Sequence, residues 1–133
     1  MKVMIDTNII ISAALFPNGK AAQALYKSIM PPYTPLLCDY VVEELYRKFK
    51  EKFPNRMVEL EAFLYHLLLF IKVVPTPEKE VQSEKKIRDP KDRPILRAAL
   101  NEHADLFLTG DKDFLESAVD DPRIISVGEF LAL

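Results

Sequence analysis

The sequence predicts an α/β fold, a three-layer sandwich in which helices flank a central, mostly parallel sheet of four to five short strands. Short apolar segments alternate with helical patterns along the chain, and this alternation is typical of parallel strands joined by helices. Turn residues and prolines separate the segments. The 133 residues, 49% of them hydrophobic and 29% charged, fit one compact domain and are too few for two.

Five short apolar segments are candidates for the strands. β-branched and other apolar residues dominate them, and several end in proline or in residues that favour turns. They are residues 2–5, 36–38, 71–74, 106–108 and 124–126. The first segment ends in Asp6, Thr7 and Asn8, where we expect a loop.

Helical spacing of apolar residues predicts the helices that join these strands. They are residues 21–30, 39–53 and 56–70, a helix opened by residues 89–94 that carries Ile95 to Leu100, residues 113–118, and a terminal helical turn from about Val127. The charged residues 78–88 hold too few apolar side chains for a core element. We expect either a solvated helix or a mobile loop there.

Composition excludes several classes of protein. Eighteen Lys and Arg against twenty Asp and Glu give a net charge of −2, so binding to a polyanion would depend on local charge. The single cysteine, Cys38, allows no internal disulfide and forms no zinc motif with the two histidines. The charge at Asp6 interrupts any signal peptide, and the longest apolar run, residues 67–71, is far shorter than the about 20 residues of a membrane span. We expect a protein of the reducing cytoplasm without a membrane anchor.

Aspartates stand at three of the predicted strand ends or helix starts. Asp6 follows the first strand, Asp92 heads a helix, and Asp111 follows the fourth strand with Asp113 close behind. Each alone is readily explained as a helix cap or a turn residue. The carboxyl ends of parallel strands meet at one edge, however, and neighbouring carboxylates repel by about 4 kcal/mol per pair at an effective dielectric constant of about 20. A bound cation relieves this repulsion, and oxygen ligands without His or Cys favour Mg²⁺ or Mn²⁺ over Zn²⁺.

Three motifs match one known family in the family's own order. They are Met-Ile-Asp-Thr-Asn-Ile-Ile-Ile-Ser-Ala at residues 4–13, Asp-Pro-Lys-Asp-Arg-Pro-Ile-Leu at residues 89–96, and Leu-Thr-Gly-Asp-Lys-Asp-Phe-Leu at residues 108–115. The sequence resembles the PIN-domain family of metal-dependent ribonucleases, especially the small stand-alone VapC-type toxins of prokaryotic toxin–antitoxin modules. The resemblance covers almost the whole chain and implies a single PIN-like nuclease domain over residues 1–133.

The resemblance assigns roles to individual residues. It places the catalytic and metal-binding acids at Asp6, Glu44, Asp92 and Asp111, with an auxiliary metal ligand at Asp113. We expect hydrogen bonds from three further residues to position the carboxylates or metal-bound water. These residues are Asn8, Ser12 and Thr109.

The glutamate is the open choice in this set. Glu43 and Glu44 both lie about 130° from the centre of the apolar stripe of their helix, so the helical pattern does not choose between them. The family pattern favours Glu44, which directly precedes Leu45, and the alternative is that both are solvated surface charges. Cys38 and Asp39 stand where relatives commonly have Ser, which leaves the cap of this helix open.

The function implied by the resemblance is hydrolysis of RNA phosphodiester bonds by an endoribonuclease that needs Mg²⁺ or Mn²⁺ and leaves a 5′-phosphate and a 3′-hydroxyl. The protein would be the toxin of a toxin–antitoxin module. A PIN-fold RNA-processing enzyme or a single-strand DNA nuclease that is not a toxin is the alternative. A domain that binds without cutting fits less well, because the acidic positions are retained. A phosphoacceptor receiver domain also fits less well, because no aspartate lies between Asp39 and Asp89 to serve as the acceptor after the third strand.

Cations are expected around an acidic pocket that accepts RNA. We expect nucleic-acid contacts from Lys20, Arg47, Lys91 and Arg93. Further candidates are Lys48, Lys50, Lys52, Lys85, Lys86, Arg88 and Arg97, and solubilising surface charge is the alternative for each. Stacking on unpaired bases or core packing is expected for Tyr33, Tyr40, Tyr46 and Tyr65.

A metal-free ribonuclease that uses His66 and His103 as acid and base is a chemically distinct alternative. The apolar surroundings of His66 and the position of His103 near a helix C-terminus argue against it. Such an enzyme would yield a cyclic phosphate and would keep its activity in EDTA.

One segment suggests association with other proteins. Residues 62–71 are almost unbroken in apolar character and cover more than one face of a helix, so part of them belongs either at an interface or in the core. Together with the resemblance, this implies an RNA substrate, a homodimer or higher oligomer, and a cognate antitoxin that covers the acidic pocket.

Overall fold

The structure, a computed structural model, describes all 133 residues and contains one five-stranded sheet in which every pairing is parallel. The strand order is β3-β2-β1-β4-β5. The strands are β1 (Lys2–Ile5), β2 (Thr34–Cys38), β3 (Lys72–Val74), β4 (Leu106–Leu108) and β5 (Arg123–Ile125). The predicted α/β class and all five predicted strands are confirmed, with ends that differ by at most two residues.

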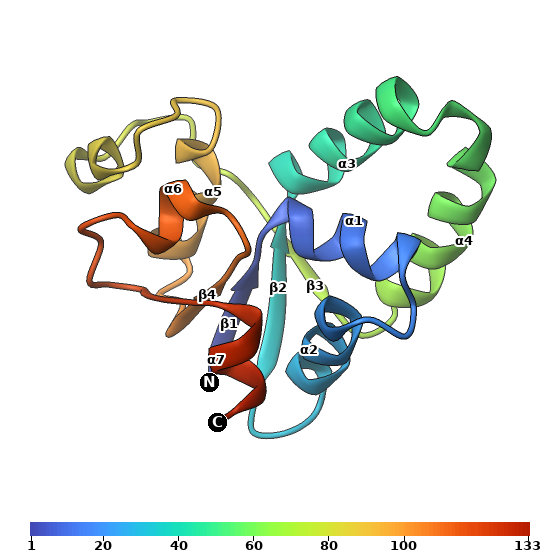
Figure 1. Cartoon of the computed structure of the whole chain (residues 1–133). Helices are drawn as coiled ribbons and strands as arrows, with labels where there is room; N and C mark the ends of the chain where they lie inside the picture. The colour runs from blue at the N-terminus through green and yellow to red at the C-terminus, as the bar shows by residue number, and fades with distance from the viewer.

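Helices cover both faces of this sheet. They are α1 (Thr7–Leu15), α2 (Lys20–Ile29), α3 (Asp39–Lys52), α4 (Met57–Leu67), α5 (Arg93–Asn101), α6 (Lys112–Leu115) and α7 (Val127–Leu131), with short 3₁₀ helices η1 (Pro54–Arg56) and η2 (Gln82–Lys86). From β1 the chain steps first toward β2 and β3, and later toward β4 and β5 on the other side. Because crossovers between parallel strands are right-handed, the helices of the two halves lie on opposite faces. Figure 1 accordingly shows α1, α2 and α4 on one side of the sheet and α5 and α6 on the other.

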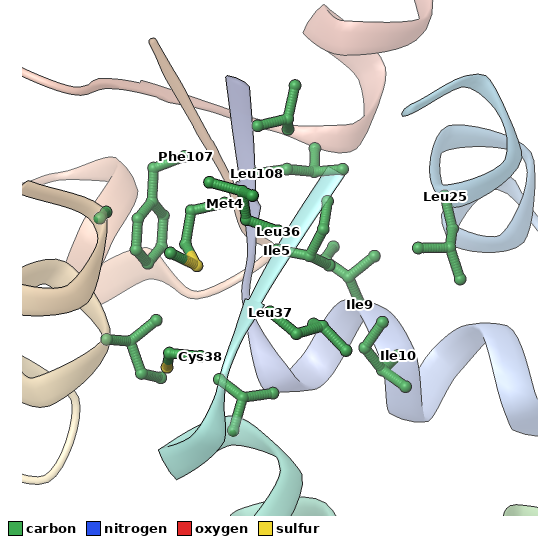
Figure 2. Close-up of a cluster of buried hydrophobic side chains, with 14 of the residues drawn as sticks. Met4, Ile5, Ile9, Ile10, Leu25, Leu36, Leu37, Cys38, Phe107 and Leu108 are labelled. Carbon is green, nitrogen blue, oxygen red and sulfur yellow. The ribbon is translucent and has the colours of Figure 1, made fainter. Parts of the chain in front are cut away.

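The core lies on both faces of the central strand. Met4 pairs in register with Leu36 on β2 and with Phe107 on β4. Figure 2 shows Met4 and Phe107 together on one side of the sheet, while Ile9 and Ile10 of α1 lie on the other side. All five side chains are at most 2% exposed, as expected for a parallel sheet covered by two helical layers.

The predicted loop after the first strand is wrong, because α1 begins directly at Thr7. Asp6 is its N-cap, and its Oδ1 accepts a hydrogen bond from the Thr7 amide at 2.8 Å. The run of isoleucines that follows has low intrinsic helix preference, but Ile9, Ile10 and Ala13 are buried. Tertiary packing therefore decides the helix.

The segment predicted as a solvated helix or mobile loop without core contact is also corrected. Within it, η2 packs against α5, and Glu84 and Ile87 are buried. Arg97 of α5 pairs with Glu84 at 2.9 Å and also donates to the Pro77 carbonyl at 2.8 Å. The ion pair between Arg97 and Glu84 and the buried side chain of Ile87 hold this segment against the domain.

The remaining helices follow the prediction with shifted ends. The helix predicted over 56–70 ends at Leu67, and the one predicted over 113–118 spans Lys112–Leu115. No helix combines the length and the apolar character that crossing a lipid bilayer requires.

Candidate active site

The acidic residues singled out in the sequence come together at the edge where the strands end. Asp6 directly follows β1, and Asp111 follows the neighbouring strand β4 after two residues. Glu44 comes from the second turn of α3, and Asp92 is the N-cap of α5. Open parallel sheets place their ligand sites at this edge, because the loops and helix starts after adjacent strands converge there.

Asp6 is fixed by hydrogen bonds on every side. Its amide donates to the Leu108 carbonyl at 3.0 Å, and its Oδ2 accepts from the Thr109 hydroxyl at 2.7 Å. The residue is only 4% exposed. Burial is the main reason that the pKa of Asp6 is raised to about 6, and the nearby charges of Glu44 and Asp111 raise it further against the hydrogen bonds that lower it.

Glu44 faces the same cluster, and Glu43 does not. The Thr7 hydroxyl donates to Glu44 Oε1, and Glu44 is 3% exposed, whereas Glu43 is exposed to solvent. Two cations of the same helix stand beside the glutamate: Arg47 Nη2 and Lys48 Nζ lie 3.6 and 3.8 Å from Oε2. Thr7, the residue after Asp6, therefore links the glutamate to the end of β1.

Asp92 is half-buried and close to several other carboxylates. Burial, followed by the charges of Asp111, Asp6 and Asp89, raises the pKa of Asp92 to about 7. Carboxylate oxygens of Asp89, Asp92 and Asp113 lie within 4.8 Å of one another. This is the arrangement that a divalent cation relieves, since it replaces mutual repulsion with shared attraction.

Asp89 is the acidic residue that the sequence analysis did not assign to the site. The Asp92 amide donates to the Asp89 carbonyl at 3.1 Å, so residues 89–92 form a turn that brings both aspartates to one place. The sequence does contain a signal for this turn, because Asp89 and Asp92 are three residues apart with Pro90 between them, and such a spacing is typical of a turn that reverses the chain.

Thr109 and Asn8, two of the three residues predicted to support the site, form hydrogen bonds that involve the loop after β4. The Thr109 hydroxyl oxygen accepts from the Asp111 amide at 2.9 Å, and Asp111 Oδ1 accepts from the Asp113 amide at 2.9 Å. Asn8 Oδ1 accepts from the Gly110 amide at 3.4 Å. Ser12 lies further along α1 and makes no side-chain hydrogen bond to these residues, so no contact in the structure supports its predicted role.

The predicted cations divide into three groups. Arg47 and Lys91 line a hollow of about 590 Å³ together with Glu44, Asp89 and Asp92. Arg93 and Arg97 instead hold the backbone or buried acids: Arg93 Nε donates to the Ile87 carbonyl at 2.9 Å, and Arg97 pairs with Glu84. Lys20 begins α2, beyond the far end of α1, and makes no ion pair with the cluster.

Most of the tyrosines and histidines considered from the sequence lie away from the acidic site. Tyr40 lines the same hollow and donates its hydroxyl to the Lys91 carbonyl at 2.6 Å, whereas Tyr33 packs against Phe130 in the core. His66 lies on α4 beside the Ala62 carbonyl, and His103 follows α5 at the opposite edge of the sheet from the site. The two imidazoles do not form an acid–base pair.

The donor set fits Mg²⁺ or Mn²⁺. Every candidate ligand is a carboxylate oxygen, and neither histidine nor Cys38 belongs to the cluster. Burial is the largest cause of the raised pKa values of Asp6 and Asp92, and neighbouring carboxylates raise them further. A bound cation would offset the repulsion from those carboxylates.

Comparison with known proteins identifies the family. The sequence profile of the PIN domain matches residues 2–113. This chain belongs to the PIN-domain family. The match contains all the acidic residues of the site and ends before β5 and α7. No curated protein matches the chain by sequence.

Solved structures share the fold of this PIN domain at low sequence identity. VapBC2 from Rickettsia felis, bound to a DNA fragment from its promoter, has a TM-score of 0.73 and 17% identity over 95% of this chain and 98% of its own. DNA-bound VapBC from Salmonella typhimurium has a TM-score of 0.69 and 16% identity over 96% of this chain and 98% of its own. VapC20 from Mycobacterium tuberculosis, a toxin that cleaves the sarcin–ricin loop, has a TM-score of 0.61 and 15% identity over 86% of this chain and 93% of its own. The PIN domain of this chain thus has the fold of VapC toxins.

Proposed function

We propose that this PIN domain is an endoribonuclease that hydrolyses RNA phosphodiester bonds with Mg²⁺ or Mn²⁺. The observation that carries the proposal is the convergence of carboxylates from four separate segments at one edge of the sheet, beside a hollow that cations surround. They are Asp6, Glu44, Asp89, Asp92, Asp111 and Asp113. Membership of the PIN-domain family supports the same reaction.

Asp6, Glu44, Asp92 and Asp111 are the residues proposed to hold the metal, with Asp113 as an auxiliary ligand. A bound divalent ion supplies a water of lowered pKa and neutralises charge on the phosphate oxygens. The hydrogen bonds from Thr7 and Thr109 orient the carboxylates of Glu44 and Asp6 before substrate arrives. Such outer contacts keep ligand oxygens in place and typically matter about 10- to 100-fold for metal affinity or activity.

The test is cleavage of labelled RNA by the purified protein with and without Mg²⁺ or Mn²⁺. We expect metal-dependent cleavage that EDTA abolishes, products with a 5′-phosphate and a 3′-hydroxyl, and no cleavage by Asp6→Asn. Asp120→Asn is the matched control, because Asp120 is exposed and forms no ion pair. Equal activity of Asp6→Asn, or a cyclic phosphate product formed in EDTA, would refute the proposal.

We propose further that the protein is the toxin of a toxin–antitoxin module. The shared fold with VapC20 and with the two VapBC structures supports this role. Expression of the protein should then arrest bacterial growth, whereas Asp6→Asn should not. RNA cleavage in vitro without growth arrest would instead favour an RNA-processing enzyme, and cleavage of single-stranded DNA alone would favour a DNA nuclease.

Association with a second copy and with an antitoxin belongs to the same proposal. Leu64, Leu67 and Ile71 are buried, but Tyr65, Leu69 and Phe70 are 61% to 72% exposed, so the apolar segment is divided between core and surface. An exposed apolar group of this kind supports a protein interface. Light scattering on the purified chain tests for the homodimer, and purification together with the product of a neighbouring gene tests for the antitoxin.

A further inference from the structure

Two hollows open beside the acidic cluster. The first hollow, about 590 Å³, is lined by Tyr40, Glu44, Arg47, Lys48, Glu51, Asp89, Lys91 and Asp92. The second hollow, about 160 Å³, is lined by Lys86, Arg88, Lys112, Asp113, Glu116 and Ser117. Polar and charged side chains make up almost all of both linings.

The two hollows meet at the carboxylates. Asp89 and Asp92 line the first hollow and Asp113 lines the second, yet oxygens of these three residues lie within 4.8 Å of one another. The acidic cluster therefore lies between the two hollows.

Each hollow carries three cations. The first basic arm consists of Arg47, Lys48 and Lys91, and the second basic arm consists of Lys86, Arg88 and Lys112. Positive charge on both sides of a negative centre suits a polyanion that is held at its flanks while one phosphate sits over the metal ligands.

Acidic residues of the site hold some of these cations in place. Arg88 Nη2 lies 2.5 Å from Asp113 Oδ1 although the Arg88 side chain is 86% exposed, and Arg47 and Lys48 lie beside Glu44. An arginine this exposed has room to exchange the carboxylate for a phosphate oxygen, because the planar guanidinium binds both groups in the same geometry. Metal binding by Asp113 would free Arg88 for that contact.

We propose that a single strand of RNA crosses the acidic cluster from the first basic arm to the second basic arm, so that the bond to be cut has bound phosphates on both sides. This inference rests on the proposed nuclease function and adds the path of the substrate. Asp6 and Glu44 are less than 5% exposed at the base of the site. We expect a single strand to bring a phosphodiester closer to them than a duplex does. The enzyme therefore cuts internal bonds and needs flanking phosphates.

The test compares one cleavage site in three positions. One RNA carries the site in the middle of a 12-nucleotide strand, and the others carry it at the 5′ or the 3′ end. The variant Lys86→Gln/Lys112→Gln removes two charges of the second basic arm, and neither lysine forms an ion pair with an acid of the site. The control variant Lys72→Gln/Lys79→Gln removes the same charge from exposed lysines that line neither hollow.

We expect the second-arm variant to lose about tenfold in kcat/KM on the central site. One of the two end sites lacks the phosphates that the second basic arm would bind, and the loss on that RNA should be much smaller. Its salt dependence should fall by about 1.4 in the slope of log kcat/KM against log salt, since each phosphate contact to a single strand contributes about 0.7. Arg88→Gln should lose more activity than Arg88→Lys, because lysine keeps the charge but lacks the planar guanidinium. Arg47→Gln changes the first basic arm, so its loss should be small on the opposite end site, the one that lacks the phosphates for the first basic arm.

Two outcomes would overturn the path. Equal losses for the two double variants would refute it, and so would equal losses on the central site and on both end sites. Binding of the 12-nucleotide RNA in Ca²⁺ separates the two proposals. Arm-dependent binding without cleavage in Mg²⁺ would contradict the nuclease function alone, and cleavage without dependence on the arms would contradict the path alone.

Discussion

The Thr109 hydroxyl donates a 2.7 Å hydrogen bond to Asp6 Oδ2, although 103 residues separate the two in sequence. Strands β1 and β4 are neighbours, and Asp6 and Thr109 are the residues that directly follow them. The same hydroxyl oxygen accepts from the Asp111 amide at 2.9 Å. One fully buried threonine thus fixes the positions of two candidate metal ligands from separate parts of the chain.

Thr109→Val tests this arrangement, because valine keeps the shape and removes the hydroxyl. We expect the fold to persist while metal affinity or RNA cleavage falls by about 10- to 100-fold, the range typical of residues that support metal ligands. Titration with Mg²⁺ and cleavage kinetics measure the two effects. Thr109→Ser keeps the hydroxyl and should stay within a few-fold of the natural protein, and equal loss in both variants would contradict the role of the hydrogen bond.

The raised pKa values of Asp6, about 6, and Asp92, about 7, predict how metal-free protein responds to pH. The unfolded chain has an ordinary aspartate pKa of 3.8. The folded state therefore holds these protons more tightly, and the stabilisation that they contribute is complete below pH 3.8 and is lost as the pH rises through about 6 to 7. Metal binding has the opposite preference, because it needs both carboxylates ionised.

Thermal unfolding with and without Mg²⁺ between pH 5 and pH 8 checks this prediction. The increase in Tm caused by Mg²⁺ should be larger at pH 7.5 than at pH 5.5, and calorimetry in two buffers should record proton release on binding at pH 6. A Mg²⁺ effect that does not vary with pH would contradict the link between these protons and the metal.

The sequence predicted the part of the site that follows from strand ends, and it predicted less well the part that depends on packing. Asp6 and Asp111 could be placed because parallel strands deliver their carboxyl ends to one edge. The choice between Glu43 and Glu44 could not be made from a helical pattern in which both lie equally far from the apolar stripe. In the structure Glu44 is buried and accepts a hydrogen bond from the Thr7 hydroxyl, so it is Glu44 that faces the other acidic residues.

Helix α1 and segment 78–88 were missed for different physical reasons. The isoleucines of α1 are β-branched, and local preference therefore disfavours the helix that burial against the sheet imposes. In segment 78–88 one of the two buried residues is Glu84, a charged residue that rules based on apolar periodicity assign to the surface. Both features arise from contacts between segments far apart in sequence.

Glu44→Gln and Glu43→Gln form a matched pair for the candidate metal site. Glutamine keeps the size of the side chain and removes its charge. We expect Glu44→Gln to lower metal-dependent cleavage by more than about 100-fold, beyond the loss typical of a residue that only supports a ligand. Glu43→Gln should stay within about twofold, as is usual for an exposed surface change. Similar losses in the two variants, measured as kcat/KM at saturating Mg²⁺, would remove Glu44 from the set of ligands.

The buried ion pair between Arg97 and Glu84 predicts a large effect on stability. The Arg97 and Glu84 side chains are 11% and 2% exposed, and three hydrogen bonds join the guanidinium to the carboxylate. Removing one partner leaves the other charge buried without compensation, so Arg97→Met or Glu84→Met alone should destabilise the fold by about 3–5 kcal/mol.

The double variant Arg97→Met/Glu84→Met distinguishes the ion pair from simple loss of packing. Because a buried pair replaced by apolar side chains of similar size is often nearly neutral, we expect it to regain most of the free energy of unfolding lost by either single variant. Urea unfolding measures all three. The single variants should also expose segment 78–88 to limited proteolysis, since the contacts of Glu84 and the Arg97 bond to the Pro77 carbonyl hold it against α5. Additive losses in the double variant would show that the two side chains stabilise the fold independently and not as a pair.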